Sequence, residues 1–194
     1  METYSLLDDP DFQAFMKAWE KSRSCDDVPL RKDITLQLFA KFIPNMMVLE
    51  HAGPREYRYC QAGEDVKDRL KMKGTGLNFF DLLHPEILPL SEQWWGGLLK
   101  QPSGGIVRYS IEYPEGMLRH AASIVLPVRR TTAGPDMLVG VTKILGERFN
   151  GQNNGQTVIG EFFAHGVYFD LGFGTLREGE ASFLHAPNPD FLSY

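Results

Sequence analysis

The sequence predicts an α+β fold: a five-stranded antiparallel sheet with helices on one face, an N-terminal helix and a C-terminal extension. The order of patterns along the chain is the first observation. Two short β-like runs are followed by a helical stretch and then by three longer β-like runs. The second is periodicity, because the β-like runs alternate with a period of two whereas the helical segments repeat at about 3.6 residues. The third is length, since 194 residues suffice for one such domain with extensions.

The composition narrows the class of protein. The chain has 20 Lys and Arg against 25 Asp and Glu, a net charge of −5, and 43% hydrophobic residues. Such apolar content excludes wholesale disorder. The negative charge, without a run of Lys or Arg, argues against nucleic acid and an anionic membrane as partners. Two cysteines cannot make a disulfide framework, and we find neither a signal peptide nor an apolar membrane span. We therefore expect a cytoplasmic protein.

An amphipathic helix is predicted near the N-terminus, where Asp8-Asp9-Pro10 offers a capping acid and a first-turn proline. Four large apolar side chains follow at i, i+3, i+4 and i+7: Phe12, Phe15, Met16 and Trp19. Burying each is worth about 1.5–3 kcal/mol, so this stripe requires a partner surface. We expect it to form the interface of a homodimer. The alternative is that the stripe covers the chain's own sheet and the protein is a monomer.

Two strands and several helices are predicted next. The strands span 45–50 and 56–61 and are joined by a turn at His51-Ala52-Gly53-Pro54. The helical patterns lie at 63–71, where Val66 and Leu70 are four residues apart, at 77–83 and at 85–95. Gly96-Gly97 would cost a helix about 1 kcal/mol each relative to alanine. The last helix is therefore expected to end there or to approach another backbone closely.

Three further strands are predicted at 106–113, 117–129 and 137–145. Pro127 suggests that the second of them ends at an edge or a bend. The chain thus divides into an N-terminal helical cap (1–28), a core domain (29–147) and a C-terminal extension (148–194). The extension carries several aromatic residues, which would leave a large exposed apolar patch if unpacked, so we expect it to be docked. These aromatic residues are Phe162, Phe163, Tyr168, Phe169 and Phe173.

A series of short motifs, each weak alone, resembles in its order the PAS domain family of short proteins common in alphaproteobacteria. The motifs are Trp19, Pro29-Leu30-Arg31-Lys32-Asp33, Ile43-Pro44 before Val48-Leu49-Glu50, Tyr57-Arg58-Tyr59 with Gly63, Gly76 with Phe79-Phe80-Asp81, and Leu126-Pro127-Val128. The resemblance covers residues 10–145. It implies the PAS fold and a bacterial sensor in signal transduction, which binds a small ligand, dimerises or contacts a signalling protein. Cys60 and Glu64 depart from the family, which often has arginine and a small hydroxyl residue there.

Catalytic and cofactor signatures are absent from the sequence. We find no nucleophile elbow, zinc helix or phosphate-binding loop, and therefore expect no enzymatic activity. The five histidines are not spaced as a local metal site would need, and the reactive-cysteine motif of flavin light sensors is missing. For haem, His84 and His120 are weak axial-ligand candidates. The cofactor, if there is one, stays unknown.

The candidate ligand site is aromatic. If the long helix covers the sheet, one cavity between them would be lined by Tyr59, Trp94, Trp95, Tyr109 and His120. Aromatic walls with few polar groups suit small-molecule binding, although these residues would equally fill a core. Three strand arginines are expected on a solvated or partner-facing surface, or alternatively as an anion site inside the pocket: Arg58, Arg108 and Arg119.

Two other functions stay open. One is a small α+β enzyme that pairs His120 with an acid such as Asp81. The other is a pure interaction module whose core is filled. No kinase, cyclase or DNA-binding segment is recognised in the sequence, so we expect any output to pass through a downstream signalling protein that is still unknown.

Overall fold

The structure, a computed structural model, describes residues 3–24, 27–72, 76–131, 134–149, 157–159 and 165–176. One antiparallel sheet dominates it, with the strand order β2-β1-β5-β4-β3-β6 and with β7 also paired to β3. The strands are β1 (Met46–Gly53), β2 (Glu56–Ala62), β3 (Gly104–Glu112), β4 (Met117–Val128), β5 (Met137–Phe149), β6 (Val158–Ile159) and β7 (His165–Phe169). The five predicted strands are β1 to β5, so the predicted fold is confirmed, with two strands added.

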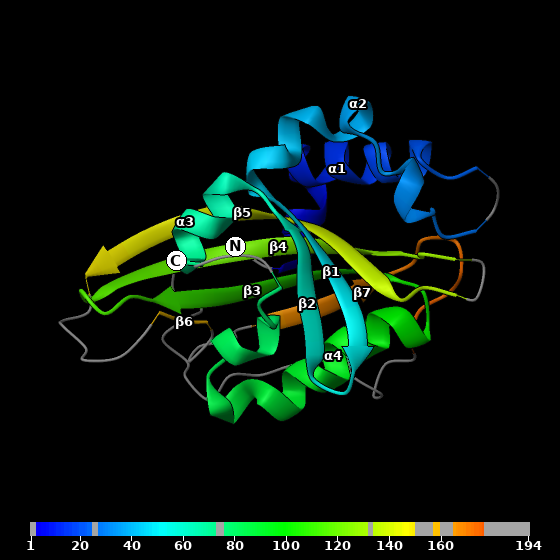
Figure 1. Ribbon diagram of the computed structural model, residues 1–194. Helices are drawn as coiled ribbons and strands as arrows, with labels where there is room; N and C mark the ends of the chain where they lie inside the picture. Colours follow the sequence, from blue (N-terminus) through cyan, green and yellow to red (C-terminus); the bar gives the residue numbers. More distant parts are fainter. Residues whose placement is uncertain are drawn as a thin grey trace.

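Helices cover both faces of this sheet (Figure 1). The α-helices are α1 (Pro10–Lys21), α2 (Leu36–Phe39), α3 (Glu64–Leu70) and α4 (Leu88–Lys100). Short 3-10 helices connect them: η1 (Thr3–Asp8), η2 (Arg31–Asp33), η3 (Ala40–Asn45), η4 (Phe79–Leu82) and η5 (Pro85–Ile87). We call the face that packs against α3, η4 and α4 the inner face, and the face that packs against α1 and α2 the outer face.

The N-terminal helix α1 begins where the sequence predicts. The Asp9 carboxylate caps it by accepting hydrogen bonds from the amides of Asp11 and Phe12. Phe12, Phe15 and Trp19 are at most 1% exposed. They pack on the outer face of the chain's own sheet, and the Trp19 indole donates to the Pro127 carbonyl at 2.8 Å.

This burial corrects the argument for a dimer interface. The stripe of Phe12, Phe15 and Trp19 already has its partner surface, which is the sheet of the same chain, so its apolarity requires no second subunit. Met16 keeps partial exposure. The homodimer itself stays a prediction.

The long helix α4 continues through both glycines. Gly97 faces the C-terminal extension, because a Cβ built there would lie 2.3 Å from the Tyr168 hydroxyl. Gly96 faces open space, with nothing within 4 Å of such a Cβ. The close approach predicted for this glycine pair is therefore made by Gly97, to a side chain of β7 rather than to another backbone.

The C-terminal extension docks on the edge of β3. Gly104 to Arg108 pair with β7, and Ile111 and Glu112 pair with β6. Docking is thus confirmed for these two strands, which extend the sheet at its edge instead of lying across a face. Phe162 and Phe163 lie outside the described residues.

Strand β4 is paired with β3 only as far as Val125. Pro127 lies beyond this point and pairs with β5 alone. The prediction of an edge at Pro127 is therefore correct for this end of the strand.

Candidate functional site

A cavity of about 20 Å³ lies between the inner face of the sheet and the helices that cover it. A space of about 10–15 Å³ holds one water molecule, so this cavity has room for little more than that. Its apolar wall is formed by Met47, Val66, Leu70, Phe79, Val107 and Ile159. Its polar or amphipathic wall is formed by Tyr59, Arg69, Trp95, Tyr109, Ser123 and Thr142.

Aromatic rings form one side of the cavity. Strand β2 alternates, so Tyr57 and Tyr59 turn inward while Arg58 stays exposed. The Phe79 ring of η4 lies between Tyr59 and Trp95, with centroid separations of 6.4 Å and 4.7 Å. The helices and β2 therefore close the cavity through ring contacts.

Three hydroxyl groups from β3, β4 and β5 lie together on the sheet side. The Tyr109 hydroxyl lies 3.0 Å from Ser123 Oγ and 3.3 Å from Thr142 Oγ1. The two smaller hydroxyls lie 2.8 Å apart. These groups satisfy one another, and each keeps further hydrogen-bonding capacity towards an occupant.

Three other polar atoms on the cavity wall are buried without a hydrogen-bond partner in the part of the chain that the structure describes. They are Tyr59 Oη, Arg69 Nε and Trp95 Nε1. Burial, and to a smaller extent Tyr109, raise the pKa of the Tyr59 phenol, whereas the charge of Arg69 acts in the opposite direction. The phenol therefore stays protonated at neutral pH and can donate. Leaving such a buried group unsatisfied costs about 1–3 kcal/mol, and native structures rarely do so.

Arg69 is 6% exposed and belongs to α3. Its Nη1 donates to Asn45 Oδ1 at 2.9 Å, and Asn45 in turn donates to Asp65 at 2.6 Å. The Tyr113 hydroxyl donates to the Arg69 carbonyl at 2.8 Å. The guanidinium and the main-chain carbonyl of Arg69 are thus both held by hydrogen bonds.

Three of the five predicted site residues line the cavity: Tyr59, Trp95 and Tyr109. Trp94 does not. It is fully buried beside Trp95 and stacks on Tyr168 of β7. His120 does not either, because it pairs with Ser110 on the opposite face of the sheet from Tyr109. His120 is therefore corrected to the outer face, where burial and the charges of Arg148 and Arg108 lower its pKa.

The positions of Asp81 and His120 do not support the alternative in which these two residues form the acid–base pair of an enzyme. Asp81 is exposed on η4, beside the helices of the inner face, and accepts a hydrogen bond from Asn78. His120 lies across the sheet on the other face. The two side chains share no cavity among the described residues, so no acid–base pair is formed by them.

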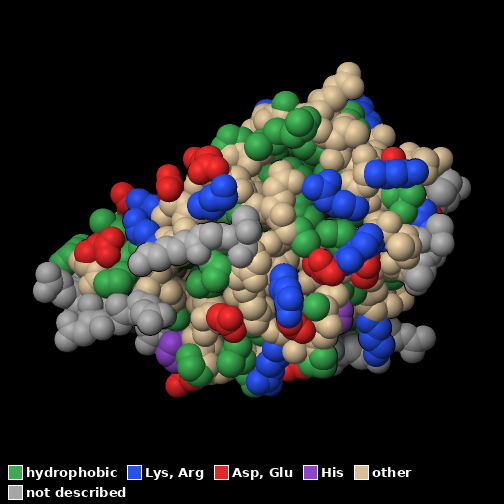
Figure 2. All heavy atoms as spheres, viewed as in Figure 1, with side chains coloured by type: hydrophobic (Ala, Val, Ile, Leu, Met, Phe, Trp, Pro, Cys, Tyr) green, Lys and Arg blue, Asp and Glu red, His purple; other side chains and the backbone are tan. Residues whose placement is uncertain are grey.

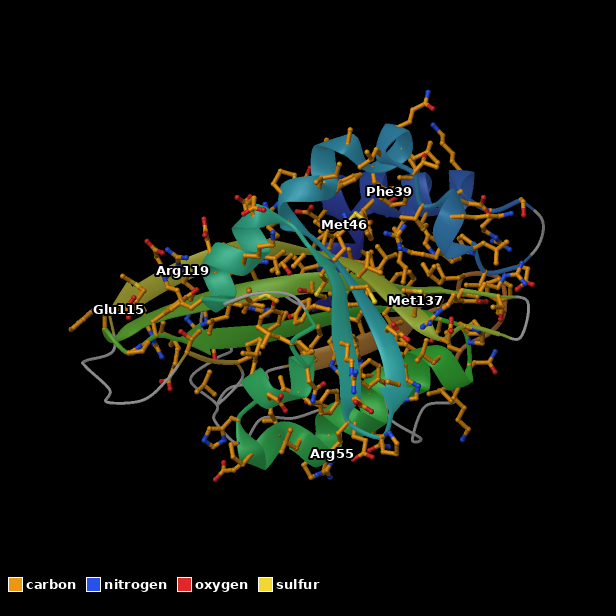
Figure 3. All side chains as sticks on the ribbon, viewed as in Figure 1. Phe39, Met46, Arg55, Glu115, Arg119 and Met137 are labelled. Carbon is orange, nitrogen blue, oxygen red and sulfur yellow. The ribbon has the colours of Figure 1, made fainter. Side chains whose placement is uncertain are left out.

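None of the three strand arginines lines the cavity. Arg58 pairs with Glu56 on the surface, and Arg119 pairs with Glu147 at 3.0 Å. Figure 3 shows Arg119 and Glu115 at one end of the sheet and Arg55 at the tip of the β1–β2 hairpin. The arginine that does line the cavity is Arg69, which the sequence analysis overlooked. Its position between Val66 and Leu70, on the apolar face of α3, is the signal that could have identified it.

Among the described residues, no three His, Cys, Asp or Glu side chains come together as a metal site would need. None of the helices in this part of the chain has the length and hydrophobicity of a membrane span. Neither haem candidate, His84 or His120, lines the cavity. On the face seen in Figure 2, side chains of both charges are interspersed without a basic patch.

Residues 7–143 of the chain match the family model of a PAS domain. This is more than half of the 194 residues. No curated protein matches the chain.

Proposed function

The chain belongs to the PAS domain family, and we propose that it is a sensory and regulatory module that binds a small molecule in the cavity between sheet and helices. Family membership supports the sensory and signalling role. One observation supports binding: Tyr59 Oη, Arg69 Nε and Trp95 Nε1 are buried on the wall of one cavity without partners among the described residues. An occupant with hydrogen-bond acceptors removes a cost of about 1–3 kcal/mol for each atom.

The C-terminal extension is the output element in this proposal. Ile159 of β6 is part of the cavity wall. Trp95 is also part of the wall, and the preceding residue, Trp94, accepts the hydrogen bond of Tyr168 in β7. An occupant that shifts Ile159 or α4 therefore changes the packing of the extension on β3. The division into cap (1–28), core (29–147) and extension (148–194) is part of the same proposal, as are the homodimer and the downstream signalling protein that reads the change.

The second candidate is an interaction module with a filled core. The small size of the cavity, about 20 Å³, favours it, because one or two water molecules would occupy that space. The two functions differ in whether the protein carries a ligand, so one measurement separates them.

Native mass spectrometry of protein purified from its own host makes that measurement. We expect the native mass to exceed that of the protein chains, one or two, by the mass of a small molecule, and we expect this excess to be lost on denaturation. Val107→Phe fills the cavity and should lose the ligand. Ile106→Phe is the matched control, since Ile106 is equally buried but packs on the outer face. Folding of both variants is checked by near-UV circular dichroism. A native mass equal to that of the protein chains alone, whether one or two, would support the filled-core module instead.

A further inference from the structure

We infer that the ligand of this cavity is a small organic carboxylate held by Arg69. The inference rests on the proposed function and adds the chemical class of the ligand. Two features of the cavity carry it, namely its charge and its hydrogen-bonding groups.

The charge is positive and not compensated inside the cavity. Arg69 as a residue is 6% exposed, and none of the ion pairs among the described residues includes it. Its hydrogen-bond acceptor is the neutral amide of Asn45 at 2.9 Å. A buried charge without an opposite charge is costly, whereas a carboxylate in contact with arginine is a strong and geometrically matched partner. An anionic ligand supplies what the protein itself does not place there.

The unsatisfied groups of the cavity are donors. Arg69 Nε and Trp95 Nε1 can only donate, and the protonated Tyr59 hydroxyl can donate as well. A ligand must therefore present several acceptor sites close together. The two oxygens of a carboxylate offer about four such sites, which is enough for all three donors. A cationic ligand would meet donors and a like charge.

The position of Arg69 is fixed before any ligand arrives. The Asn45 amide connects its guanidinium to Asp65, and Tyr113 holds its main-chain carbonyl. Preorganised donors lose little conformational entropy on binding, which favours even a small ligand.

The remaining walls select a short apolar tail. Val66, Leu70 and Ile159 lie around the polar groups, and the cavity is about 20 Å³. The space as it stands holds little more than one water molecule, so a carboxylate with one or two further carbons requires the side chains of the wall to move apart. The apolar wall favours an organic acid over an inorganic oxyanion, which would leave these side chains against a charged surface.

Nuclear magnetic resonance of the Trp95 indole N–H tests the inference, because this group lies on the cavity wall and its resonance shifts when it acquires an acceptor. The signal is identified by its loss in Trp95→Phe. Acetate, acetamide and nitrate are titrated into the wild type at equal ionic strength. We expect a saturable downfield shift with acetate, at least tenfold weaker binding of the isosteric neutral acetamide, and no saturable response to nitrate.

Variants of Arg69 then test whether this residue supplies the positive charge that holds the carboxylate. Arg69→Met should weaken acetate binding at least tenfold without changing the response to acetamide, whereas Arg69→Lys should retain part of the acetate affinity. The wild-type comparison of acetate with acetamide stands alone if Arg69→Met does not fold. Equal binding of acetamide and acetate would overturn the carboxylate inference and leave the proposed ligand-binding function intact. A wild type that responds to nitrate but not acetate, or to none of the three, would also overturn it. The proposed function fails separately, through a native mass without ligand.

Discussion

The hydroxyl of Tyr168 in β7 donates a hydrogen bond to the main-chain carbonyl of Trp94 in α4 at 2.9 Å. The two rings stack with their centroids 6.0 Å apart. Because Trp95, the next residue of α4, is part of the cavity wall, this contact joins the C-terminal extension to the helix that closes the candidate site.

The two adjacent glycines of α4 should respond oppositely to alanine. In a helix interior, glycine to alanine gains about 0.5–1 kcal/mol, and Gly96→Ala should show this gain because nothing lies near its Cβ. Gly97→Ala places a Cβ 2.3 Å from the Tyr168 hydroxyl, so it should cost about 1–3 kcal/mol through overpacking. Urea unfolding measures both variants. Equal gains would mean that β7 is not packed against α4.

A single added methyl group should be tolerated on the inner face and costly on the outer face. Val107 lines the cavity, whereas Val139 is equally buried in the packed outer cluster. Val107→Ile should change the free energy of unfolding little or raise it, and Val139→Ile should lower it by about 1–3 kcal/mol. Chemical denaturation of the pair compares the two. A comparable loss in Val107→Ile would indicate that the cavity is already filled.

His120 should make stability depend on pH. Its pKa is lowered in the folded state by burial and by the nearby Arg148 and Arg108, so the unfolded chain binds the proton more tightly. The contribution of neutral His120 is therefore complete above the unfolded pKa of about 6.5 and is lost as the pH falls towards the lower folded pKa. His120→Gln should flatten the decrease in unfolding free energy between about pH 7 and pH 5. An unchanged slope would contradict the position given to this side chain.

Trp19→Glu should unfold the protein instead of splitting a dimer. The Trp19 side chain is fully buried on the chain's own sheet, and even truncation of such a residue costs about 3–5 kcal/mol. The test of the dimer therefore requires a variant at a residue that is only half-buried. Met16 is such a residue, so Met16→Glu is the better choice. Sedimentation at high micromolar concentration should give a dimer for the wild type and a shift to monomer for Met16→Glu. A monomeric wild type would exclude the dimer.

The sequence predicted elements whose pattern is local. The stripe of α1 and the alternation of β3 are set by residues close in the chain, so α1 and the inward direction of Tyr109 were predictable. The added strands β6 and β7 were not, because they are two and five residues long and their pairing depends on the free edge of β3.

The errors at the site have two physical causes. The face occupied by His120 depends on its register against Ser110, which a single strand pattern does not reveal. Arg69 was overlooked because a charged helical residue is ordinarily solvated, although here it lies between two buried neighbours, Val66 and Leu70.

A high-resolution crystal structure of protein purified from its own host is the most direct test of ligand binding in the cavity. We expect ordered density that is larger than one or two water molecules, within hydrogen-bonding distance of Tyr59 Oη, Arg69 Nε and Trp95 Nε1. The contrary result is a cavity that holds only water, or a closed cavity in which these three atoms bond to other protein groups, and it would show that the core carries no ligand.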